Sequence, residues 1–153
     1  MKVLLVEDDL DKSRKIEEWL TEGYSLFELT TVRSFSPALD ALLDIRPGFD
    51  IVLLDMSMPN FEGALYDADG DPPETFAGRD LLAQMKLRNI VVPTIVVTMF
   101  DNFGEKEGRV SAQDLAAELK RDYPDSFRGL VYYSQAQDTW RTSLRKLVDG
   151  ILR

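Results

Sequence analysis

The chain has 153 residues, enough for one ordinary domain with a hydrophobic core, and 44% of its residues are hydrophobic. Its formal net charge of −9 at pH 7 disfavours direct binding to nucleic-acid phosphates or to anionic membranes. It contains neither cysteine nor histidine, which excludes disulfides, thiolate nucleophiles, imidazole bases and the usual zinc sites. Any chemistry must therefore rest on carboxylates, hydroxyls, amines and metals bound through oxygen.

The first half of the chain alternates short apolar runs with helical patterns. Val3 to Val6 is predicted to be a strand covered by helices on both faces. The run is too short for a signal sequence, and acidic residues follow it directly. Apolar residues at helical spacing predict a helix over roughly residues 10 to 22. Leu26 to Val32 is predicted to be a second strand. Ser36 and Pro37 have the residue types that begin a helix, as its cap and its first residue.

The second half continues this alternation. The predicted elements are a third strand over 51–54, a helix around 81–85, a fourth strand over 95–98, a helix around 115–119, a fifth strand over 130–133 and a helix over 144–151. Together they predict an α/β fold with three layers, a flavodoxin-like doubly wound five-stranded parallel sheet in the order 2-1-3-4-5. We expect a single domain over residues 1–153, with no appended output domain and no membrane span. We expect it in the cytoplasm.

Acidic residues follow two neighbouring strands of this predicted sheet. Glu7 and Asp8 come directly after the first strand, and Asp55 follows the third. Because the carboxyl ends of parallel strands meet at the functional edge of such a sheet, we expect the three carboxylates to share one pocket. Two such charges about 4 Å apart repel by roughly 4 kcal/mol at an effective dielectric constant near 20. A hard divalent cation with oxygen ligands, Mg²⁺ by default, would relieve that repulsion.

Three segments of the sequence resemble the receiver domains of response regulators, the CheY-like superfamily. Lys2 to Asp9 is similar to the opening of these receivers. Phe49 to Pro59 is similar to their phosphoacceptor strand and the following turn, and Gly63 stands where that turn usually has its glycine. Pro93 to Thr98 is similar to their fourth strand, which ends in threonine or serine. The resemblance covers nearly the whole chain.

This resemblance implies a receiver of two-component signal transduction, with Asp55 as the residue that accepts a phosphoryl group. Glu7 and Asp8 are then expected to hold Mg²⁺ together with Asp55 and the backbone carbonyl of Ser57. Thr98 is expected to sense the phosphoryl group. The chain would be a phosphoacceptor rather than an enzyme, with at most self-phosphorylation and self-dephosphorylation chemistry.

The partners implied by the resemblance are proteins. Because the chain has no histidine, its phosphoryl donor must be external, and the family implies a histidine kinase or a phosphotransfer protein. The signal would pass by protein contacts to a downstream protein partner. We expect no direct contact with nucleic acid and none with a membrane, and a homodimer is left open.

The end of the fifth strand departs from the family. Receivers normally have a lysine there, whereas the matching position in this chain is Tyr133 or Ser134. A tyrosine donates a neutral hydrogen bond, and charged hydrogen bonds are about twice as strong. Loss of the ammonium therefore predicts weaker phosphorylation or weaker coupling to the surface around Tyr132 to Leu144.

The length of two loops is a second departure. Extended loops are expected at about residues 60–78 and 101–128, as candidate lids or docking surfaces. The segment from Ala64 to Ala77 is predicted to be mobile and exposed, because it combines glycine, prolines and acids with little apolar content.

Other interpretations stay open at this point. A pseudo-receiver would keep the fold and act as a protein-binding module without phosphorylation. A Mg²⁺-dependent phosphohydrolase on a similar sheet would need a second aspartate shortly after the nucleophile, and Asp55-Met56-Ser57 lacks one.

Three acidic or hydroxyl features have simpler alternatives. Asp67 to Asp71 resembles the start of a calcium loop, but the required glycine and glutamate are absent, which favours a solvated acidic loop. Asp9 or Asp11 can be a helix cap, and Thr98 can be an ordinary strand residue.

Overall fold

The computed structural model describes residues 1–44, 48–57, 76–103 and 110–153, with only the backbone of Asn102 and Phe103. Gly63, the acidic run from Asp67 to Asp71 and residues 64–75 of the segment predicted to be mobile lie outside the described residues.

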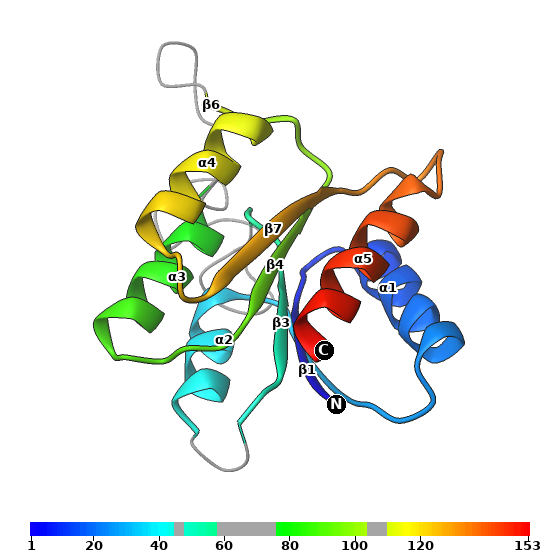
Figure 1. Cartoon of the computed structure of the whole chain (residues 1–153), viewed down its shortest axis with the longest axis horizontal. Helices are drawn as coiled ribbons and strands as arrows, with labels where there is room; N and C mark the ends of the chain where they lie inside the picture. Colours follow the sequence, from blue (N-terminus) through cyan, green and yellow to red (C-terminus); the bar gives the residue numbers. More distant parts are fainter. Residues whose placement is uncertain (45–47, 58–75, 104–109) are drawn as a thin grey trace.

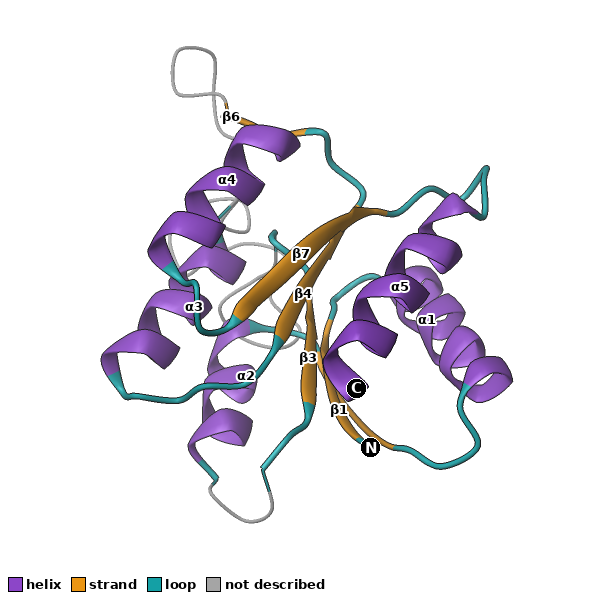
Figure 2. Ribbon diagram, viewed as in Figure 1, coloured by secondary structure: helices purple, strands orange, loops and turns teal. Residues whose placement is uncertain are grey.

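The centre of the molecule is a five-stranded parallel sheet (Figures 1 and 2). Its strands are β1 (Lys2–Val6), β2 (Glu28–Val32), β3 (Ile51–Leu54), β4 (Thr94–Thr98) and β7 (Phe127–Tyr132). Their spatial order is β2-β1-β3-β4-β7. Counted along the sheet strands alone, this is the order 2-1-3-4-5, so the predicted flavodoxin-like fold is confirmed.

The five described helices are divided between the two faces of the sheet. They are α1 (Leu10–Gly23), α2 (Phe35–Leu43), α3 (Ala77–Leu87), α4 (Ala112–Asp122) and α5 (Thr139–Leu152). α1 and α5 lie together on one face, and α2, α3 and α4 lie on the other (Figure 1). None of the described helices is long and apolar enough to cross a membrane.

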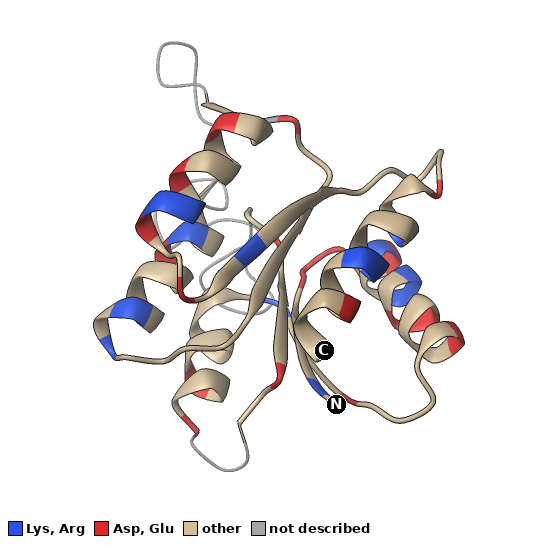
Figure 3. Ribbon diagram, in the orientation of Figure 1, with Lys and Arg blue, Asp and Glu red and all other residues tan. Residues whose placement is uncertain are grey.

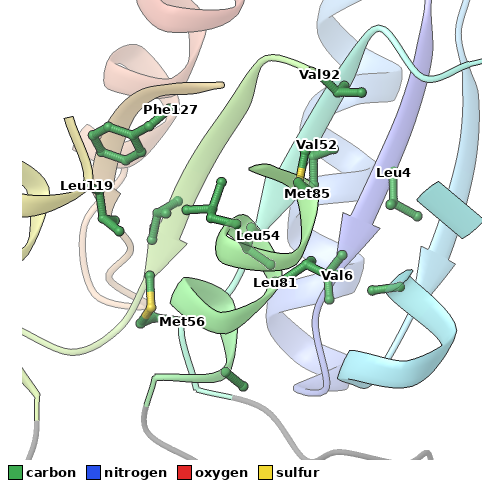
Figure 4. Packing of buried hydrophobic residues seen from close by; sticks show 14 of the residues in the cluster. Leu4, Val6, Val52, Leu54, Met56, Leu81, Met85, Val92, Leu119 and Phe127 are labelled. Atoms are coloured by element: carbon green, nitrogen blue, oxygen red, sulfur yellow. The ribbon is translucent and has the colours of Figure 1, made fainter. Parts of the chain in front are cut away.

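The two faces of the sheet pack into separate cores, because alternate strand residues point to opposite sides. Leu4 and Leu54 belong to the core beneath α2, α3 and α4 (Figure 4). Leu5 and Leu53, their neighbours in sequence, belong to the core beneath α1 and α5. Full burial of each such side chain contributes roughly 1.5–3 kcal/mol. Charged residues lie mainly on the helices and loops around this sheet (Figure 3).

The start of α2 differs from the prediction. The N-cap is Ser34 and the helix begins at Phe35, so Ser36 lies inside the helix instead of capping it. Pro37 is consequently the third helical residue. A proline is tolerated there because the first amide groups of a helix have no partner within it.

Two strands begin at other residues than the apolar runs predicted. β2 begins at Glu28. Leu26 lies before the strand, and its side chain is 82% exposed instead of packing into a core. β7 begins at Phe127, upstream of the predicted start at residue 130. The exposed Arg128 and the following glycine interrupt the apolar pattern of this edge strand, so periodicity alone finds only its second half.

Parts of the two ranges predicted to contain extended loops belong to described helices and strands. Residues 101–128 include a two-stranded antiparallel sheet of β5 (Asn102–Phe103) and β6 (Val110–Ser111), then α4 and the first residues of β7. A strand of two residues is too short to show the alternation of apolar and polar residues from which strands are predicted. At the other loop, Ala77 and Gly78 already belong to α3 and are buried, so the prediction of an exposed Ala77 is wrong.

Candidate functional site

Three carboxylates meet at the carboxyl ends of β1 and β3. Val6 and Leu54 are partners in the register of these adjacent strands, so Glu7 and Asp55, which follow them, emerge side by side. Carboxylate oxygens of Glu7, Asp8 and Asp55 lie within 4.8 Å of one another. Glu7 and Asp55 are buried and Asp8 is partly buried. The structure thus brings together the three acids on which the metal prediction depends.

A lysine from α1 lies among these acids. Lys12 is fully buried, and its ammonium pairs with Glu7 Oε1 and, at 3.3 Å, with Asp55 Oδ1. The same Nζ donates a hydrogen bond of 2.6 Å to the carbonyl oxygen of Val97 on β4. An ammonium has three donors, and here three acceptors face it. The site is therefore a mixed cluster of acids and one cation.

The local structure of α1 explains how Lys12 reaches the site. Asp9 is the N-cap, and its side chain accepts a hydrogen bond of 3.0 Å from the backbone amide of Lys12, so the cap interpretation of Asp9 is confirmed. Side chains of a helix lean toward its N-terminus, which here faces the ends of β1 and β3. The helix macrodipole disfavours a cation in the first turn. Neighbouring carboxylates outweigh that effect.

Backbone groups hold both buried carboxylates in place. Asp55 Oδ1 accepts a hydrogen bond of 2.9 Å from the amide of Met56, and Glu7 Oε2 accepts one of 3.1 Å from the amide of Asp9. The start of α3 packs directly behind Asp55. A Cβ atom added to Gly78 would lie 2.7 Å from the carbonyl oxygen of Asp55, so only glycine allows this approach.

The electrostatics of the cluster favour a shared proton or an added cation. Burial raises the pKa of Glu7 to about 8; the Lys12 ammonium opposes this rise and the Asp55 charge adds to it. Burial likewise raises the pKa of Asp55, against the effect of Lys12. Burial and the Asp55 charge raise the pKa of Asp8. Burial would lower the pKa of Lys12, but Asp55 and Glu7 outweigh it and keep the ammonium charged.

Thr98 and Ser57 occupy the surroundings of this cluster. Thr98 is fully buried at the end of β4, the neighbour of β3, and its hydroxyl accepts a hydrogen bond of 3.1 Å from the amide of Phe100. Ser57 lies two residues after Asp55 and is partly buried. The sensing role of Thr98 and metal binding by the Ser57 carbonyl stay predictions.

Tyr133 follows β7, whose end carries no lysine, as the sequence indicates. The Tyr133 ring is buried, and its centroid lies 5.9 Å from Nζ of Lys12. The site nevertheless holds an ammonium, because Lys12 supplies one from α1. The available signal was a lysine in the first helical turn after an acidic run, where the helix itself disfavours a cation.

The chain is similar to known response regulators. No protein-family model matches the sequence. It is 32% identical over 148 residues to the Detocs response regulatory protein DtcB of Enterobacter cloacae (strain JD6301). The aligned region covers 97% of this chain and 98% of that protein.

Solved structures show the same fold. The CheY-like receiver domain from Methylobacillus flagellatus superposes with a TM-score of 0.61 at 22% identity, over 99% of this chain and 98% of that one. The Mn²⁺-bound form of response regulator Rcp1 superposes with a TM-score of 0.60 at 21% identity, over 95% of this chain and 90% of that one. With the parallel sheet and the acids at its carboxyl edge, these similarities establish that the chain belongs to the response-regulator receiver family of two-component systems.

Proposed function

We propose that this receiver accepts a phosphoryl group on Asp55 in a Mg²⁺-dependent reaction and signals through protein contacts. The observation that supports this most is the position of the Asp55 carboxylate, buried at the end of β3 between two other carboxylates and one ammonium. A carboxylate in such a pocket is a nucleophile whose surroundings can bind both a metal and a charged phosphoryl group.

The donor set fits Mg²⁺. Glu7, Asp8 and Asp55 offer hard oxygen ligands within 4.8 Å of one another, and the carbonyl of Ser57 would add a fourth. When all groups are ionised, one ammonium among three carboxylates leaves two excess negative charges, which a divalent cation balances. The Rcp1 structure holds a divalent ion in a protein of the same fold. Bound Mg²⁺ would neutralise charge on the phosphoryl oxygens.

The proposed reaction uses one residue as the nucleophile. A carboxylate oxygen of Asp55 attacks the phosphorus of the donor in line and forms the new O–P bond. The bond between phosphorus and the leaving atom of the donor breaks, and the leaving group departs with that electron pair. Thr98, at the end of the neighbouring strand β4, would sense the new group. The phosphoryl group would later be lost to water, so in this proposal the chain is a phosphoacceptor with at most self-phosphorylation and self-dephosphorylation chemistry.

The partners in this proposal are proteins. A histidine kinase or a phosphotransfer protein supplies the phosphoryl group, since the chain has no histidine of its own. A downstream protein reads the phosphorylated surface. The net charge of −9 disfavours direct binding to nucleic acid or to an anionic membrane.

Acetyl phosphate tests the proposal without the cognate donor. In the presence of Mg²⁺, intact-mass measurement of the wild-type protein is expected to show one phosphate adduct, with acetate as the leaving group. Asp55→Asn should remove it, because the amide is not a nucleophile. An adduct that persists in Asp55→Asn would assign the acceptor elsewhere, and a wild type that stays unmodified would favour the phosphorylation-independent pseudo-receiver.

A further inference from the structure

The buried lysine of α1 needs an explanation that the fold does not give. A cation in the first turn of a helix is opposed by the macrodipole, and a buried ammonium is costly unless it is paired. Lys12 is nevertheless fully buried with its ammonium against Asp55. We propose that Lys12 is the cation that binds the phosphoryl group on Asp55, a role that rests on the proposed phosphorylation of that residue.

The ammonium lies where phosphorylation of Asp55 would place new negative charge. Its Nζ is 3.3 Å from Asp55 Oδ1, and a phosphoryl group bonded to this carboxylate adds strong anionic acceptors beside it. The flexible four-carbon stem of a lysine lets the ammonium follow those acceptors. Among the residues that the structure describes, Lys12 is the one cation paired with Asp55. The positive charge on the protein side of the phosphoryl group therefore comes from α1.

The present partners of the ammonium show why it can change acceptors. Its donors are used by Glu7, Asp55 and the carbonyl of Val97. A metal held by Glu7 and Asp55 would draw on the same carboxylates, so Mg²⁺ and the ammonium compete for them. An ammonium displaced from these acids inside a buried site needs another acceptor. A phosphoryl oxygen supplies one that is more anionic than the Val97 carbonyl.

The residue after β7 is consistent with this assignment. Tyr133 presents an aromatic ring 5.9 Å from Nζ of Lys12, a distance at which the ring face attracts a cation. The ring also packs against Trp140, with centroids 5.0 Å apart. The strand end therefore supports the ammonium from one side and adds no charge of its own.

Beryllofluoride, a mimic of the phosphoryl group, tests Lys12 by calorimetric titration in the presence of Mg²⁺. Lys12→Met keeps an unbranched side chain that is one atom shorter and removes its charge. We expect the affinity for beryllofluoride to fall on the order of 10- to 100-fold, as for loss of a charged hydrogen bond. The affinity for Mg²⁺ alone should not fall, because a competing cation has been removed. A lysine that only neutralised the acids would not lower the affinity for beryllofluoride while leaving that for Mg²⁺ undiminished.

Lys15→Met is the matched control. Lys15 lies on the same helix, is exposed and pairs with Glu18. The Lys15→Met variant should bind beryllofluoride and Mg²⁺ with the same affinities as the wild type. A second measurement needs no substitution at Lys12: in nuclear magnetic resonance spectra of the wild-type lysine ammonium groups, beryllofluoride should shift the signal of Lys12 and leave that of Lys15 in place.

The outcomes separate this proposal from the proposed function. Equal beryllofluoride affinity in wild type and Lys12→Met, or an unmoved Lys12 signal at saturation, would remove Lys12 from the phosphoryl site and leave the role of Asp55 intact. Failure of the wild type to bind beryllofluoride with Mg²⁺, or binding that persists in Asp55→Asn, would overturn both proposals.

Discussion

At the scale of single residues, Glu7 makes the stability of the metal-free protein depend on pH. Its pKa rises from 4.5 to about 8 on folding, so the folded state holds a proton that the unfolded state has lost. Stability from this group is complete below pH 4.5 and is lost as the pH rises through about 8. The buried Asp55, whose pKa is also raised, adds to the same trend.

We therefore expect the free energy of unfolding, measured by urea titration with a chelator present, to decrease between about pH 5 and pH 8. Glu7→Gln cannot ionise and should remove most of this decrease. The exposed Asp11 provides the control, since Asp11→Asn should leave the pH profile unchanged. A wild-type stability that increases over this range would contradict the assignment.

Asp8 is the acid in the cluster without a contact to Lys12 among those described, so its charge is the most available to a metal. Asp8→Asn is expected to weaken Mg²⁺ binding by at least about tenfold, by loss of an anionic ligand. Calorimetry should show unchanged affinity in Asp11→Asn, which carries the same change on the nearby helix. Equal affinity in Asp8→Asn and wild type would mean that the metal lies elsewhere.

The same residues show what sequence can predict about the site. Glu7, Asp8 and Asp55 follow apolar strands directly, so the strand order alone places them together. Lys12 reaches them from a helix, and its direction depends on how α1 packs on the sheet. Such a tertiary placement has no periodic signature, so the sequence alone does not place this ammonium at the site.

At the scale of elements, the strands buried on both faces were the most predictable. β3 has the predicted bounds, and β1 and β4 extend the predicted runs by a single residue, because their apolar runs are continuous. β7 lies at the edge, and an exposed arginine and a glycine interrupt its apolar pattern, so the pattern does not show its start. The hairpin of β5 and β6 is too short to have a pattern.

Among the described helices, α3 supports the proposed phosphoacceptor most directly, because its first residues pack against the backbone of Asp55. Gly78→Ala would place a Cβ 2.7 Å from the carbonyl oxygen of Asp55 and 3.0 Å from Cα of Met56, and backbone atoms cannot move away cheaply. We expect a loss of about 1–3 kcal/mol in unfolding free energy, and slower phosphorylation by acetyl phosphate.

Gly150→Ala is the matched change, because a Cβ at this position of α5 meets open space. It should stabilise the protein by about 0.5–1 kcal/mol through helix propensity. Urea titration of both variants decides the matter: equal stability would show that α3 does not hold Asp55 in place.

At the scale of the whole molecule, α1 links the site to two other parts of the fold. Near its start, Lys12 binds the Val97 carbonyl at the end of β4. At its far end, the Tyr24 hydroxyl donates a hydrogen bond of 2.9 Å to Asp149 of α5, and Arg145 donates one of 3.2 Å to the Gly23 carbonyl. The far end is thus tied to α5, and under the proposed phosphorylation of Asp55 we expect the start of α1 to be the part that moves.

Beryllofluoride is accordingly expected to shift amide resonances near Asp55, Thr98 and the first turn of α1. Apart from Tyr133, whose ring lies near Lys12, and Trp140, which packs against that ring, the surface around Tyr132 to Leu144 should change much less, because the cation does not belong to β7. Backbone nuclear magnetic resonance spectra with and without beryllofluoride test this. Large shifts across that surface would show a path from the site through β7 and α5.

The position of Lys12 has a consequence for the history of the sequence. In the proposed role of Lys12, one ammonium serves Asp55, and two ammonium groups in one buried pocket would repel each other. Gain of a lysine at position 12 and loss of the lysine after the last strand should therefore covary among relatives. An alignment in which both lysines, or neither, commonly occur together with the acids of this site would show that the two positions evolve independently. Covariation would instead indicate that the lysine at one position replaced the lysine at the other, while the net charge of the pocket stayed the same.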